Sequence, residues 1–267
     1  MIKLICIDVD GTLVNNFKII TKRTLTTLLR AQESGIKIAI ASSRPLSGLK
    51  RYADKLQLDK YEGALSTCNG AIVIDYSTKE IIGDHTINLS LAHSFIEHIE
   101  KYKVATLVYT GTNFYTNMVN PIIKFIIEKL THQKPVYSKN LNDIIDFDPN
   151  NIVMIASNKK LAKIKSDIEM KFGDSLHITF TGRSSLEAMP KDINKGTSIL
   201  DLAKYYKLNI DEVLAFGDGH NDYEMIKTAG CGVAMKNANK DLKKVADYIT
   251  LSNSDDGVAD YIEKFIL

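Results

Sequence analysis

The sequence has only three cysteines among its 267 residues, and none of them forms a C-x-x-C pair. Cys6 and Cys231 lie in apolar, strand-like segments, and Cys68 leaves the count odd. We therefore expect buried, reduced thiols rather than a disulfide or a zinc site. A catalytic thiol would need an activating neighbour, which the surrounding sequence does not clearly supply.

A large net charge is also absent, since 34 Lys and Arg residues stand against 32 Asp and Glu residues and leave +2. This balance gives no bulk attraction for nucleic acid or for a membrane surface. No apolar run approaches the length of a membrane span, and Met1 leads straight into a strand-like segment instead of a signal peptide. We expect a cytoplasmic protein without nucleic-acid or membrane partners.

Two common phosphate-binding loops are missing. No G-x-G-x-x-G opens a helix after a strand, and no G-x-x-x-x-G-K-[ST] occurs, which disfavours dinucleotide binding and a P-loop site. The 45% of hydrophobic residues, with 15 Gly and 5 Pro, are typical of a globular protein. A chain of 267 residues is long for one compact core, so two domains or one large insert are expected.

The first and last parts of the chain alternate strand-like and helix-like segments. Short apolar runs predict buried strands, and a helical spacing of apolar residues predicts the helices between them. This order favours an α/β fold with a doubly wound parallel sheet and right-handed crossovers. The predicted strands are Ile2–Ile7, Ile36–Ala41, Gly63–Thr67, Val213–Phe216, Cys231–Met235 and Tyr248–Leu251; the predicted helices are Thr21–Ser34, Leu46–Leu56, Lys195–Lys207, Asn221–Thr228, Asn239–Val245 and one that ends at Ile266.

The pattern changes between about Gly83 and Met189. We predict that residues 83–189 form an inserted α+β domain, with a sheet that could be antiparallel, and that residues 1–82 and 190–267 form the core domain. The predicted strands of the insert are Ala105–Tyr109, Asn113–Asn117, Asn151–Ala156 and His177–Thr181, and its predicted helices are Leu89–Lys101, Pro121–Leu130 and Lys160–Phe172.

Acidic residues follow two of the predicted core strands. Asp8 and Asp10 come after the first strand, and Asp218 comes after Val213–Phe216. Carboxyl ends of parallel strands meet at one edge of a sheet, where open α/β folds place their ligands. Carboxylates that share a buried edge repel each other and need a proton or a cation, and Mg²⁺ suits such oxygen ligands. Each segment taken alone could be an ordinary Asp-Gly turn.

Several segments resemble, in the right order, the motifs of phosphatases of the haloacid dehalogenase (HAD) superfamily. The insert and the Lys195-Gly196 that follows it are similar to the Cof-type branch, whose type IIB α/β cap lies between the second and third motifs. The resemblance covers nearly the whole chain and implies a Rossmann-like core with that inserted cap. The segments are Asp8-Val9-Asp10-Gly11-Thr12, Ser42-Ser43-Arg44, Lys195-Gly196 and Gly217-Asp218-x-x-Asn221-Asp222, with Asn69-Gly70-Ala71 matching a further segment of the Cof branch.

The resemblance implies roles for the acidic residues. Asp8 would be the nucleophile that becomes an aspartyl-phosphate. Mg²⁺ would be bound by Asp8, the backbone carbonyl of Asp10 and Asp218. The Asp10 side chain would stay off the metal and act as general acid, then as general base. Asp222 would orient Lys195 or a metal-bound water rather than bind the metal directly.

The resemblance also implies which groups bind the phosphate. They are the Ser42 hydroxyl, the backbone N–H groups of Val9 and Ser43, the Lys195 ammonium and Asn221. The second motif usually reads Thr-Gly-Arg, so Ser43 restricts the backbone more than the usual glycine. His220 stands at a permissive position and is expected to face solvent rather than relay a proton.

Substrate specificity would come from the cap. The candidates are Tyr109–Tyr115 and Thr181–Ser184, including Arg183, while Arg44 and Asn69 on the core could reach a polar substrate. The plain alternatives are packing for the aromatic residues and a surface charge for Arg183. The branch implies small phosphomonoesters, sugar phosphates among them, as substrates of a Mg²⁺-dependent phosphatase.

Two other functions stay open on these residues. A phosphomutase would use the same core but shelter the intermediate from water. A phosphate-sensing binding protein with weak catalysis is less favoured, because Asp8 and Asp10 are both present. The sequence does not choose between a monomer and a dimer.

Overall fold

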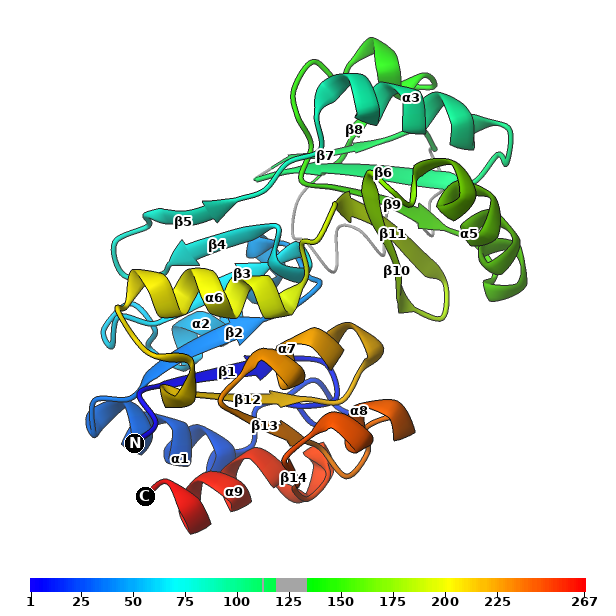
Figure 1. Cartoon of the computed structure of the whole chain (residues 1–267). Coiled ribbons are helices and arrows are strands. Elements are labelled where there is room, and N and C mark those ends of the chain that lie inside the picture. Colours follow the sequence, from blue (N-terminus) through cyan, green and yellow to red (C-terminus); the bar gives the residue numbers. More distant parts are fainter. Residues whose placement is uncertain (112, 119–133) are drawn as a thin grey trace. The chain divides into compact units, whose positions relative to one another are not determined.

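The computed structural model describes residues 1–111, 113–118 and 134–267, which divide into two compact units (Figure 1). The core unit comprises Met1–Ser43, Leu49–Gly83 and Asn194–Leu267, and the inserted unit comprises Arg44–Gly48 and Asp84–Ile193. Arg44, which the sequence placed on the core, therefore groups with the inserted unit. The predicted helix Pro121–Leu130 lies outside the described residues.

The core unit is built on an eight-stranded sheet in the order β14-β13-β12-β1-β2-β3-β4-β5. The pairs from β14 to β3 are parallel, and β4 is antiparallel to β3. Its strands are β1 (Leu4–Asp8), β2 (Lys37–Ala41), β3 (Ala64–Thr67), β4 (Ile72–Asp75), β5 (Ile81–Asp84), β12 (Val213–Gly217), β13 (Cys231–Ala234) and β14 (Tyr248–Ile249).

Helices cover both faces of this sheet (Figure 1). Leu4 and Cys6 of β1 pack with residues of α6 and α7, whereas α1 and α9 contact each other on the opposite face. Because side chains alternate along a strand, β1 must be apolar on both faces, and all five of its residues are buried. The helices are α1 (Lys22–Glu33), α2 (Leu46–Lys55), α6 (Lys195–Tyr205), α7 (Tyr223–Thr228), α8 (Lys240–Val245) and α9 (Gly257–Phe265).

The inserted unit has its own sheet in the order β10-β11-β9-β6-β7-β8. Its pairs are antiparallel except β7 with β8, which are parallel. Two helices, α3 (Leu89–Glu100) and α5 (Asn158–Phe172), pack on this sheet around a separate hydrophobic core. The strands are β6 (Ala105–Thr110), β7 (Asn113–Thr116), β8 (Val136–Tyr137), β9 (Asn151–Ile155), β10 (Leu176–Gly182) and β11 (Ser185–Pro190).

The structure confirms the parallel core and the second, mainly antiparallel sheet, and it corrects three details. Strands β4, β5, β8 and β11 were not predicted. The predicted helix from Asn221 begins as a 3-10 turn, His220–Asp222, before α7. Cys231 is half-buried rather than buried, and none of the three cysteines, all of which lie in the described residues, forms a disulfide.

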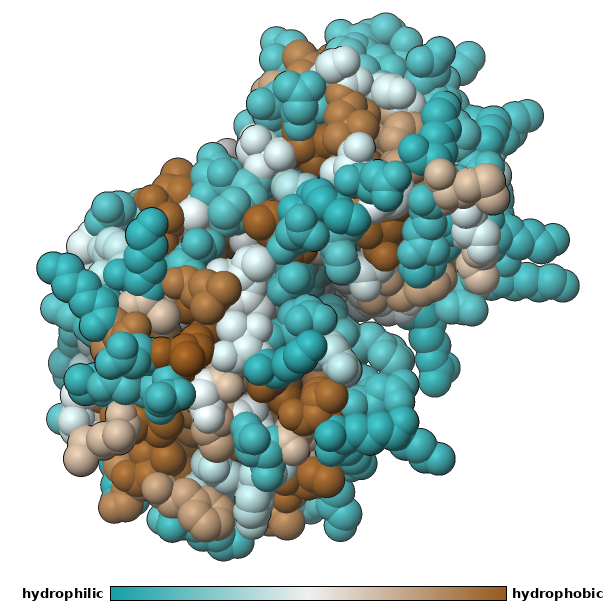
Figure 2. All heavy atoms as spheres, viewed as in Figure 1, coloured by the Kyte–Doolittle hydropathy of each residue, from teal (hydrophilic) through white to brown (hydrophobic). Residues whose placement is uncertain are grey.

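Among the helices formed by residues 1–111, 113–118 and 134–267, none is long and apolar enough to cross a membrane. On the face drawn in Figure 2, hydrophilic residues interrupt the hydrophobic ones.

Candidate active site

The carboxyl edge of the core sheet gathers the acidic residues that the sequence singles out. Strand β1 lies between β12 and β2, with Ile7 paired to Phe216 and Asp8 paired to Ala41. These registers bring the segments that follow the three strands to the same edge. Carboxylate oxygens of Asp8, Asp218 and Asp222 lie within 4.8 Å of one another. We call these three residues the acidic cluster.

Lys195 places its ammonium inside the acidic cluster. It is the first residue of α6, which Asn194 caps by accepting hydrogen bonds from the Gly196 and Thr197 backbone N–H groups. Its Nζ donates to Oδ1 of Asp8 and to Oδ1 of Asp222, both at 2.6 Å, and the side chain is fully buried. A buried ammonium is tolerated only with such charged partners.

The carboxylate of Asp222 serves two partners. Oδ1 accepts from Lys195, while Oδ2 accepts from the backbone N–H groups of Asp218 at 2.9 Å and Gly219 at 2.8 Å. It therefore fixes both the lysine and the start of the loop that carries Asp218.

Asp218 is held by neutral donors. Its Oδ1 accepts from the Thr12 hydroxyl at 3.1 Å, and its Oδ2 accepts from Nδ2 of Asn237 at 3.2 Å. Gly11 has a φ of +100°, and a Cβ there would lie 2.3 Å from Oδ2 of Asp218. Glycine is therefore required at position 11 by both backbone conformation and space.

The cluster carries more negative than positive charge. Burial, and then the charge of Asp222, raise the pKa of Asp8 well above its usual range, against the lowering effect of Lys195. Burial and Asp222 also raise the pKa of Asp218 to about 6. Burial alone would lower the pKa of Lys195, but Asp222 and Asp8 raise it above its usual value. Three carboxylates and one ammonium favour the binding of a divalent cation.

The side chain of Asp10 contacts a lysine at the edge of the site. Nζ of Lys18 donates to its Oδ1 at 2.6 Å, and about a third of the Asp10 side chain is exposed. The turn that supplies Lys18 is ordered by Asn15, whose Oδ1 accepts from the Phe17 and Ile19 backbone N–H groups. The side chain of Asp10 thus has its own cation at the edge of the site.

The remaining predicted phosphate contacts lie on neighbouring loops of the core unit. Ser42 follows β2, is buried, and its carbonyl accepts the N–H of Asn69 at 2.9 Å. Asn69 adopts a left-handed conformation with φ 55°, and its Oδ1 accepts from Nδ2 of Asn221 at 2.9 Å. Val9 is buried and Ser43 is half-buried. His220 is exposed, as the sequence predicted.

The candidates on the inserted unit are placed mainly by packing. Tyr109 stacks edge-on against Phe114 with ring centroids 4.6 Å apart, which fits the plain alternative for both. The Thr181 hydroxyl donates to Glu187, and Arg183 is exposed. Thr112 lies outside the described residues.

Sequence reasoning missed Thr12, Lys18 and Asn237 as site residues. Thr12 belongs to the segment that carries Asp8, so its place in that segment was an available signal. Lys18 and Asn237 reach the site through loop geometry, for which the sequence carries no recognisable pattern.

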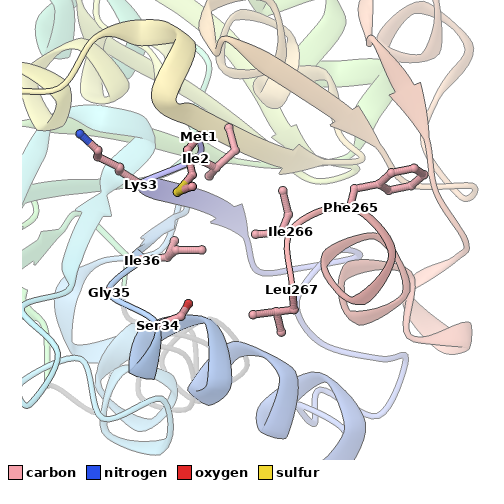
Figure 3. Close-up of a pocket in the computed structure, with 9 residues that line it drawn as sticks. All are labelled: Met1, Ile2, Lys3, Ser34, Gly35, Ile36, Phe265, Ile266 and Leu267. Carbon is pink, nitrogen blue, oxygen red and sulfur yellow. The ribbon is translucent and has the colours of Figure 1, made fainter.

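A cavity of about 640 Å³ lies at the other edge of the core sheet (Figure 3). The residues that line it include Ile2 and Lys3, which precede β1, and Ile36, which precedes β2. Asp8, by contrast, is the last residue of β1. The cavity therefore lies at the opposite end of β1 from the acidic cluster.

A parallel α/β core with this acidic edge, interrupted by a second sheet, matches known proteins over its whole length. The sequence pattern of the haloacid dehalogenase-like hydrolases matches residues 5–262, and the chain belongs to that family. It is a phosphatase of this family, of the Cof type. The resemblance, the fold class and the enzyme class predicted from the sequence are thereby confirmed.

Three relatives illustrate the match. A Bacillus subtilis protein, 5-amino-6-(5-phospho-D-ribitylamino)uracil phosphatase YcsE, is 30% identical over 100% of this chain and 96% of its own length. The crystal structure of a haloacid dehalogenase-like hydrolase from Bacteroides thetaiotaomicron is 31% identical, with a TM-score of 0.90 and 100% of both chains covered. The subclass IIB sugar phosphatase BT4131, at 24% identity, TM-score 0.85 and 98% of both chains, supports the fold.

Proposed function

We propose that the chain is a Mg²⁺-dependent phosphomonoesterase that works through an aspartyl-phosphate on Asp8. The observation that carries the proposal is the convergence of Asp8, Asp218 and Asp222 within 4.8 Å around the buried ammonium of Lys195. In this mechanism Asp8, the backbone carbonyl of Asp10 and Asp218 would hold the metal. When bound, Mg²⁺ neutralises charge between the carboxylate and the phosphate dianion.

In the first step an oxygen of Asp8 forms a bond to phosphorus while the ester P–O bond breaks. Lys195 fixes the Asp8 carboxylate through Oδ1 and adds positive charge beside the phosphoryl oxygens. Asp10 gives its proton to the leaving alkoxide. The Ser42 hydroxyl and the Val9 and Ser43 backbone N–H groups, with Asn221, bind the phosphoryl oxygens.

In the second step Asp10, now a carboxylate, takes a proton from water. The water oxygen bonds to phosphorus, the bond from phosphorus to Asp8 breaks, and inorganic phosphate leaves. Asp222 takes no part in either transfer but orients Lys195 through Oδ1. Asp10, whose Oδ1 accepts a hydrogen bond from Lys18, makes both proton transfers.

We further propose that residues 83–189 form a cap domain that sets substrate specificity, and that residues 1–82 and 190–267 form the catalytic core. The substrates proposed are sugar phosphates or sugar-alcohol phosphates, because one relative acts on a phosphoribityl compound by its name. Arg44, Asn69 and Arg183 remain the candidates for contacts to the leaving group.

A panel of phosphate esters assayed with Mg²⁺, beside Asp8→Asn, tests the proposal. The variant should stay folded and lose activity by several orders of magnitude, because an amide cannot form the acyl phosphate. Unchanged turnover in the variant would reject the covalent mechanism. Net release of inorganic phosphate from a hexose phosphate separates this function from a pure phosphomutase.

A further inference from the structure

Asn237, in the loop that follows β13, contacts two segments of the acidic edge at once. Its Nδ2 lies 2.8 Å from the carbonyl oxygen of Gly11 and 3.2 Å from Oδ2 of Asp218. Its Oδ1 accepts the backbone N–H of Asn253 at 3.0 Å. Because the oxygen faces a donor, the amide must present its nitrogen to the two acceptors.

These contacts join parts of the site that come from distant loops. Asp218 follows β12, whereas Gly11 belongs to the loop after β1 and directly follows Asp10. With Thr12 on Oδ1 and Asn237 on Oδ2, each oxygen of the Asp218 carboxylate accepts one hydrogen bond. Such contacts fix the direction in which a carboxylate offers its other lone pairs.

A second asparagine anchors the same arrangement. Nδ2 of Asn253 donates to the carbonyl of Val14 at 2.8 Å, and Asn253 is buried. Its backbone N–H is the donor that orients Asn237. The loop after β1 is therefore tied at Gly11 and at Val14 to the segments that carry the two asparagines.

We propose that Asn237 is a positioning residue of the metal site. It holds the Asp218 carboxylate in register with the peptide chain after Asp10, so that ligands from two loops keep the spacing that a small divalent cation demands. This inference rests on the proposed function, in which Asp218 and the Asp10 carbonyl bind Mg²⁺. Loss of a group that orients a ligand typically weakens metal binding by about 10–100-fold.

Calorimetric titration of Mg²⁺ into the full-length wild type and Asn237→Ala tests the proposal. The variant should show a Mg²⁺ dissociation constant raised by about tenfold or more, with the melting temperature of the metal-free protein close to that of the wild type. The Mg²⁺ concentration for half-maximal activity should rise by a similar factor, while kcat at saturating Mg²⁺ changes much less.

Asn209→Ala is the matched control. Asn209 is exposed and caps the 3-10 helix Ile210–Glu212, which precedes β12 and so lies at the opposite edge of the sheet. Its removal should leave the Mg²⁺ dissociation constant unchanged. A dissociation constant in Asn237→Ala within twofold of the wild type overturns this inference alone, whereas a wild type that binds no Mg²⁺ overturns the proposed metal site as well.

Discussion

Lys195 is fully buried because two carboxylates receive its ammonium at 2.6 Å each. Replacing it with an uncharged side chain would leave Asp8 and Asp222 facing each other without that cation. Removing one partner of a buried ion pair generally costs about 3–5 kcal/mol. Stability and catalysis thus depend on the same side chain.

We expect Lys195→Met to lower the free energy of unfolding by about 3 kcal/mol in the absence of Mg²⁺ and to reduce kcat by at least about hundredfold. Urea denaturation and a phosphatase assay measure the two effects. Lys204→Met, at an exposed position of α6, should change neither. A Lys195→Met variant as stable and active as the wild type would contradict this role.

The pKa of Asp218, raised from 3.8 to about 6, predicts a pH dependence. Between these values the metal-free folded state binds more protons than the unfolded state, so the free energy of unfolding should fall as pH rises through this window. Mg²⁺ must displace the proton, so below pH 6 its affinity should fall by about tenfold per pH unit. Thermal melts with and without Mg²⁺ at pH 5 and pH 7.5 check both, and an equal Mg²⁺-induced shift at the two values would refute the assignment.

The loop after β1 is the element whose geometry the site depends on most. Gly11 combines a φ of +100° with a close approach to the Asp218 carboxylate. Gly35 has a φ of +91° but nothing within 4 Å of a Cβ. Comparing substitutions at these two glycines therefore distinguishes the effect of backbone strain from the effect of a steric clash with Asp218.

Gly11→Ala should raise the Mg²⁺ dissociation constant and lower kcat/KM by at least about tenfold, because the added methyl group displaces Asp218. Gly35→Ala should cost only the backbone strain of about 1 kcal/mol and leave Mg²⁺ binding intact. Equal effects of the two substitutions on Mg²⁺ binding would show that the contact with Asp218 does not matter.

The meeting of Asp8, Asp218 and Lys195 could be predicted from the sequence because parallel strands deliver their carboxyl ends to one edge. Strand β4 could not, since it is short and follows the positive-φ residues Asn69 and Gly70, which reverse the chain. The contact of Asn237 with the site could not be predicted either, because its position depends on a turn rather than on a periodic pattern.

At the scale of the whole molecule, each unit has a separate hydrophobic core. The acidic cluster belongs entirely to the core unit. In the inserted unit, Phe95 is fully buried and packs edge-on against Phe172 at 5.2 Å. Binding of Mg²⁺ to the core unit and truncation of a buried side chain in the inserted unit should therefore shift different unfolding transitions.

Scanning calorimetry should show that Mg²⁺ raises the transition of the core unit, while Phe95→Ala lowers that of the inserted unit by removing about 3–5 kcal/mol of packing. Phe265→Ala, at an exposed position, is the control and should shift neither strongly. If Mg²⁺ and Phe95→Ala move one common transition, the two units do not unfold independently.

The most direct test of the account is to trap the phosphoryl group on Asp8. Asp10→Asn, mixed with Mg²⁺ and an ester whose good leaving group needs no proton, should be phosphorylated but hydrolyse the intermediate slowly. Acid quenching and mass spectrometry should then find one added phosphoryl group on the peptide that contains Asp8. Wild-type turnover with no adduct in the variant, or an adduct on another residue, would contradict the central claim.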